Sequence, residues 1–120
     1  MSNKIGGNYA MVIQKNCEFI KNSNTPIVSK VFPNASGDIL SLQITGGDGL
    51  YHLEGRNNRN GEWVSLAGVN LSDFSAIRGG FTKAGLYEIG IIGIRELRVR
   101  VERVSGNVSV FGQIISVEET

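Results

Sequence analysis

The sequence predicts an all-β protein, an antiparallel β-sandwich of jelly-roll or immunoglobulin-like type with seven to nine short strands. Sixteen glycines against two prolines favour short strands joined by tight turns. Apolar and polar residues alternate with a period of two in several runs, as half-buried strands require. The runs recur at spacings of roughly ten residues, which is typical of sandwiches and small barrels.

Residues 1–26 differ from the rest, because asparagine is frequent there and the apolar pieces at 9–13 and 17–20 are short. We interpret residues 1–26 as an N-terminal arm and residues 27–120 as the sandwich domain. The arm either pairs as one or two strands or lies across a neighbouring subunit, and the sequence leaves both open. Residues 1–24 are expected to be cut by proteases in the isolated protein and protected after assembly.

The first part of the sandwich contains a β-branched run at residues 27–32, which Pro33 ends because proline lacks a ladder donor. A regular strand follows from Asp38 to a glycine-rich turn at residues 46–49. Residues 50–56 and 63–66 then form a predicted hairpin around the Asn- and Gly-rich turn between them. The residues expected to point inward are Leu40, Leu42, Ile44, Tyr51 and Leu53.

The second part begins with a weaker strand at residues 69–74 and an irregular connection at 75–85. Two alternating runs then flank a break at Gly93. A final hairpin at residues 105–107 leads into a strand at 108–117 that is apolar on both faces. The residues expected to point inward are Tyr87, Ile89, Ile91, Leu97, Val99 and Val101.

An apolar strand with two apolar faces needs cover that a small monomer lacks. We therefore predict that part of the last strand is buried against a partner, most simply a second copy of the chain. The predicted assembly surface consists of Phe111, Ile114, Ile115 and Val117.

The charges and the single cysteine exclude several classes of partner. A formal net charge of +1 gives no field to attract a nucleic acid or an anionic membrane. Arginines at 95, 98, 100 and 103 alternate with Glu96 and Glu102, a pattern that favours cross-strand ion pairs. Cys17 has no internal disulfide partner, and neither a secretory signal nor a membrane span is found, so we expect synthesis in a cytoplasm.

Catalytic and metal sites are not predicted. His52 is the only histidine, and the serines do not lie in the sharp strand-to-helix turn that exposes a nucleophile. In a catalytic arrangement Asp48 or Glu54 would have to orient His52. We interpret His52 instead as a surface residue on the flank of a strand. Asp48, His52 and Glu54 are the candidate metal ligands, but the sequence shows no further ligands at the usual spacing, and we expect neither a metal site nor a cofactor.

Glycan binding is the alternative function, since sugar rings stack on exposed aromatic side chains. Trp63 is out of phase with Val64 and Leu66, which places it on the solvent side. It is the candidate glycan contact.

Residues 40–68 and 85–114 resemble a β-sandwich module of tailed-bacteriophage virion proteins. That module has a hairpin of the form F-E-G-S-x-D-G-G-x-x-W-x-x-L, then G-x-Y, an alternating V-R-V-R strand and a closing S-G-x-V-x-V turn. The matching residues here are Leu53-Glu54-Gly55, Asn60-Gly61, Trp63, Leu66, Gly85, Tyr87, Gly93, Leu97-Arg98-Val99-Arg100, Ser105-Gly106, Val108 and Val110.

The resemblance implies a fold and a setting but no active site. Similar modules decorate capsids, form head fibres or belong to tails, often as trimers. The chain is therefore expected to be a non-enzymatic virion protein, made in the cytoplasm of a bacterial host, that associates with itself and with other virion proteins. A carbohydrate-binding module that recognises a host surface glycan is the alternative.

Overall fold

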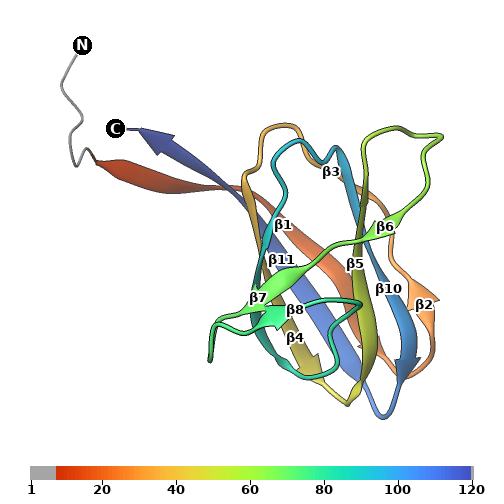
Figure 1. Ribbon diagram of the computed structural model, residues 1–120. Helices are drawn as coiled ribbons and strands as arrows, with labels where there is room; N and C mark the ends of the chain where they lie inside the picture. Colours follow the sequence, from red (N-terminus) through yellow and green to blue (C-terminus); the bar gives the residue numbers. More distant parts are fainter. Residues whose placement is uncertain (1–7, 120) are drawn as a thin grey trace.

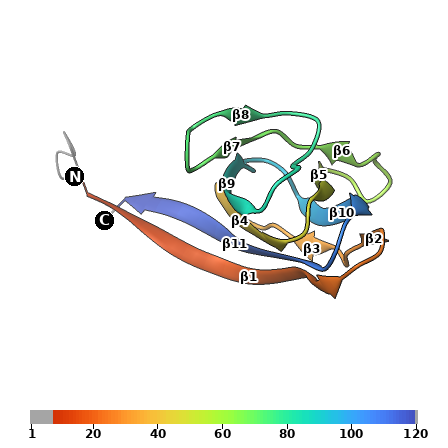
Figure 2. The same ribbon diagram turned by 90° about the horizontal axis from the view of Figure 1, so that it is seen from below.

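The structure, a computed structural model that describes residues 8–119, consists of two antiparallel sheets packed face to face (Figure 1; Figure 2). The predicted sandwich is confirmed, although this part of the chain has more strands than the seven to nine expected. The strands are β1 (Tyr9–Ser23), β2 (Ile27–Val28), β3 (Phe32–Pro33), β4 (Ile39–Gly46), β5 (Gly49–Arg56), β6 (Val64–Ser65), β7 (Gly68–Asn70), β8 (Ala76–Ile77), β9 (Gly85–Gly90), β10 (Glu96–Val104) and β11 (Val108–Glu119).

The extra strands are pieces of two residues, too short for alternation to reveal them. One of them, β8, lies in the connection that was predicted to be irregular. The β-branched run at 27–32 is divided between β2 and β3, and Pro33 lies inside β3 rather than after it. No helix in residues 8–119 is long and apolar enough to cross a membrane.

The first sheet has the strand order β1-β11-β4-β9-β7-β8, and the second has the order β2-β10-β5-β6, with β3 also paired to β10. In residues 8–119 six connections between consecutive strands therefore pass from one sheet to the other, among them β4 to β5, β9 to β10, and β10 to β11. The predicted hairpin at residues 105–107 is wrong, because β10 pairs with β5 whereas β11 pairs with β4 and β1. The turn closes one end of the sandwich instead.

Two of these connections lie against each other and require glycine. The amide of Gly47 donates to the carbonyl of Asn107, and the amide of Ser105 donates to that of Asp48, each at 2.8 Å. A Cβ at Gly46 or Gly47 would overlap the backbone of residues 105–107, and Gly46 also has a φ of 112°. The close approach explains the glycine-rich turn.

The core lies between the sheets and contains every residue predicted to point inward, all at most 2% exposed. Phe81 and Tyr87 meet edge to face with ring centroids 4.6 Å apart. The Tyr87 hydroxyl donates to the carbonyl of Lys83 at 2.6 Å, so the polar end of this buried ring is satisfied.

The described part of the predicted arm is an edge strand of the first sheet. β1 pairs with β11 from Tyr9 opposite Glu119 to Ser23 opposite Val108, which is one of the two arrangements that the sequence left open. Cys17, Phe19 and Ile20 from this strand belong to the core. Residues 1–7 of the predicted arm lie outside the described residues, and the division at residue 26 stays a prediction.

Candidate functional site

The ends of β1 and β11 continue past the sandwich as a two-stranded ribbon (Figure 1; Figure 2). Met11 lies directly opposite Val117, and Ile13 opposite Ile115. Because directly opposite residues share one side of a sheet, these side chains form one apolar surface together with Tyr9. We call this surface, Tyr9, Met11, Ile13, Ile115 and Val117, the ribbon face.

The ribbon face is open to solvent. Tyr9 is 65% exposed, Met11 67% and Ile13 52%. Exposed apolar surface that is continuous rather than scattered is typical of interaction sites. Beside it, the outer edge of β1 has no neighbouring strand within residues 8–119, so its backbone groups are available for pairing.

The four residues of the predicted assembly surface divide between the two faces of β11. Phe111, Ile115 and Val117 point outward, whereas Ile114 is 2% exposed and packs in the core. The period of two along the strand already separates Ile114 from the other three. Residues of β1, which the sequence did not associate with this surface, supply the rest of the ribbon face.

The outer face of the second sheet carries a network of ion pairs. Glu54, nearly buried, accepts hydrogen bonds from Nε of Arg98 at 2.8 Å and Nε of Arg100 at 2.9 Å. Arg56 donates to Glu96 at 2.7 Å. Burial disfavours the charge on Glu54, but the hydrogen bonds from Arg100 and Arg98 outweigh it and lower the pKa of this carboxyl. The predicted cross-strand pairing is confirmed for Arg98 and Arg100, whereas Arg95 and Arg103 form no ion pair within residues 8–119.

His52 lies between a hydroxyl and a carboxylate. Its Nδ1 is 3.0 Å from Oγ of Ser65, and its Nε2 is 2.9 Å from Oε1 of Glu102. The expectation of a surface residue is wrong, since His52 is 7% exposed, and its partner is neither Asp48 nor Glu54. A bulge between Val101 and Arg103 inserts Glu102 into β10 beside His52, a displacement that alternation does not reveal.

The order Ser65, His52, Glu102 matches that of a nucleophile, a base and an orienting acid. Ser65, however, lies on strand β6, paired with Glu54 of β5, rather than at an exposed turn. Glu102 is also held by Arg100 at 3.4 Å. We interpret the series as a structural link that fixes β6 on the sheet.

Trp63 is half-buried, and its ring is engaged by two cations. The guanidinium carbons of Arg56 and Arg98 lie 4.2 and 4.3 Å from the ring centroid. A sugar that stacked on Trp63 would compete with these groups.

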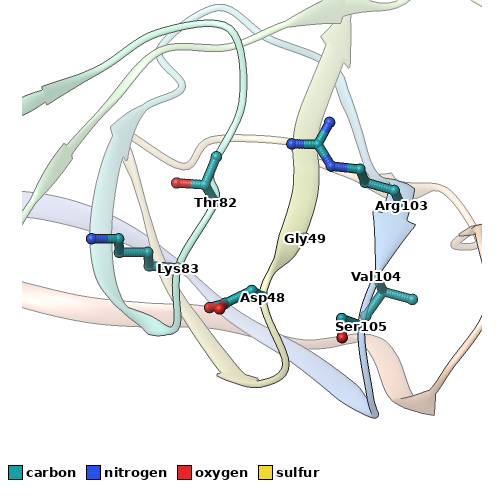
Figure 3. Close-up of a pocket in the computed structure, with 7 residues that line it drawn as sticks. All are labelled: Asp48, Gly49, Thr82, Lys83, Arg103, Val104 and Ser105. Carbon is teal, nitrogen blue, oxygen red and sulfur yellow. The ribbon is translucent and has the colours of Figure 1, made fainter.

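A pocket of about 440 Å³ lies at the end of the sandwich where the sheet-changing turns meet (Figure 3). Lys83 and Arg103 line it from opposite sides, and Asp48 lines it from the turn between β4 and β5, but the charged ends of the two cations stay apart. A binding pocket usually has polar groups that converge, and here they diverge. In the described part of the chain, no three His, Cys, Asp or Glu side chains gather to hold a metal ion.

The fold and its surfaces define a small β-sandwich with a protruding, partly apolar ribbon. No protein-family model matches the sequence, and no curated protein matches it either. Two solved structures of phage-derived proteins share the fold. The SPBc2 prophage-derived protein YomS has a TM-score of 0.76 and 21% identity, over 95% of this chain and 100% of that chain.

The PBSX exported protein XepA has a TM-score of 0.77 and 18% identity, over 90% of this chain. The match spans 38% of the length of XepA. At these identities the likeness shows the fold alone.

Proposed function

We propose that the protein is a non-enzymatic structural or accessory protein of a phage particle, of the capsid-decoration, head-fibre or tail type. It acts by binding copies of itself, with a trimer favoured, and other particle proteins. It is made in the cytoplasm of the bacterial host. The ribbon face carries this proposal, since Met11 and Val117 are paired, apolar and exposed at the end of a projection.

Two further observations support an assembly role. Arg56, Arg98 and Arg100 on the outer face of the second sheet are bound to Glu96, Glu54 and Glu102, which lowers the positive charge that this face offers a nucleic acid. The phage origin of both structural neighbours supports the setting.

The test is the location of the protein after phage production. Particles purified on a density gradient are analysed by mass spectrometry and by immunogold labelling, with particles from a deletion strain as the control. We expect the protein to co-purify with particles at a constant ratio. Recovery only in the soluble fraction would overturn the proposal.

The proposal that the protein is not an enzyme is tested separately with a fluorophosphonate probe, which reacts with activated serines. We expect no labelling of the protein while a serine hydrolase in the same tube is labelled. Labelling that disappears in Ser65→Ala would show that Ser65, His52 and Glu102 form a working site.

A further inference from the structure

We propose that a hollow on the outer face of the first sheet binds a neutral saccharide. The hollow has a volume of about 390 Å³, within the range of small-ligand sites. It lies on four adjacent strands, β1, β11, β4 and β9, away from Trp63. We call it the outer hollow.

Two rows of side chains line the outer hollow. In one row, Glu18 is opposite Phe111, Phe111 is opposite Gln43, and Gln43 is opposite Leu86. In the next row, Asn16 is opposite Gln113, which is opposite Ser41. Because opposite side chains on one face are close neighbours, the two rows form one continuous surface.

The polar groups of the outer hollow are available to a ligand. Within residues 8–119 its polar side chains form a single hydrogen bond with the protein, from Nε2 of Gln113 to Oδ1 of Asn16 at 3.2 Å. On the outer face of the second sheet, by contrast, Arg98 and Arg100 both donate hydrogen bonds to Glu54. The polar side chains on the outer face of the second sheet thus bind one another, whereas most of those in the outer hollow have no protein partner within residues 8–119.

The chemistry of these groups selects the ligand class. Each amide offers both a donor and an acceptor, which suits the hydroxyl groups of a sugar. Phe111, 38% exposed, supplies an aromatic ring against which the C–H face of a sugar can pack. Glu18 is the only charged side chain among the lining residues, so an anionic ligand is disfavoured.

The experiment is a titration of the ¹⁵N-labelled protein with neutral oligosaccharides of glucose, galactose, mannose and N-acetylglucosamine, up to roughly 50 mM. The side-chain NH₂ signals of Asn16, Gln43 and Gln113 report directly on the outer hollow. We expect saturable shifts of these signals with at least one sugar, and weaker binding of the corresponding uronic acid because of Glu18.

Variants locate the site. Gln43→Ala and Phe111→Ala should each weaken binding about tenfold, while Trp63→Ala should leave it unchanged. Gln43 is exposed on the sheet, so its variant keeps the test valid if Phe111→Ala folds poorly. Absence of saturable shifts, or loss of binding in Trp63→Ala alone, would overturn the proposal.

A second copy of the chain is the competing occupant. If the amide signals shift with protein concentration in the absence of sugar, a protein contact covers the outer hollow and the saccharide proposal is wrong. A negative result in the sugar titration does not bear on the proposal that the protein belongs to a phage particle, because that proposal is tested by co-purification.

Discussion

Met11 of β1 lies directly opposite Val117 of β11, on the outward side of a ribbon that projects from the sandwich, and both side chains are exposed. A cross-strand apolar pair in this position contributes little to the fold of its own chain. Its side chains are therefore free to be buried by a partner.

We predict that Met11→Thr combined with Val117→Thr shifts the protein from oligomer to monomer. Both side chains are in water in the single chain, so the free energy of unfolding of the monomer should change by less than about 1 kcal/mol. Size-exclusion chromatography with light scattering across micromolar concentrations measures the oligomeric state. The control is Ile92→Thr, at an exposed apolar residue between β9 and β10, away from the ribbon face. A monomeric wild-type protein would contradict the prediction.

Glu54→Gln should lower the free energy of unfolding by roughly 2 kcal/mol, because Arg98 and Arg100 would lose the carboxylate between them. This decrease in the free energy of unfolding is smaller than for a fully buried ion pair, because both arginine side chains are partly exposed to water. Urea unfolding measures it. Glu62→Gln makes the same chemical change at an exposed site and should cost less than about 0.5 kcal/mol. Equal stability of the two variants would refute the network as a stabilising element.

The same carboxylate predicts how stability depends on pH. The pKa of Glu54 is lower in the folded protein than its usual 4.5. Its contribution is therefore complete above the unfolded value and is lost as the pH falls through the folded value. Wild-type stability should fall more steeply than that of Glu54→Gln between about pH 5 and about pH 3.

The pKa of Glu102 is also lowered, chiefly by its hydrogen bond with His52. Glu102 therefore also makes the folded protein less stable as the pH falls. It is present in both proteins, so the comparison isolates Glu54 apart from the change that Glu102 undergoes through the Arg100 side chain that the two carboxylates share. Parallel pH profiles for wild type and Glu54→Gln would contradict the assignment.

Gly46→Ala should destabilise the protein by more than about 2 kcal/mol, because a Cβ there overlaps the Asn107 backbone and φ is 112°. Gly90→Ala is the control: its Cβ would meet open space at a backbone angle that alanine adopts. Thermal unfolding of both variants provides the measurement. A stable Gly46→Ala protein would show that the two sheet-changing turns do not need their close contact.

The sequence predicted the inward residues because alternation is a local property of a strand. Leu97, Val99 and Val101 are buried as expected, and Arg98 and Arg100 point outward between carboxylates. Tyr51 and Tyr87 were assigned to the core for the same reason, and both are in it. Each of these assignments needs only the period of two and no knowledge of the neighbouring strand.

The partners of each strand were decided by the tertiary structure alone. The turn at Ser105 resembles that of a hairpin, yet β10 and β11 belong to different sheets, because pairing depends on contacts between residues distant in sequence. A one-residue bulge brings Glu102 to His52, and the pairing of β1 with β11 creates the ribbon face. The sequence by itself thus determined which side of each strand is buried, whereas long-range pairing determined which exposed side chains lie together as surfaces.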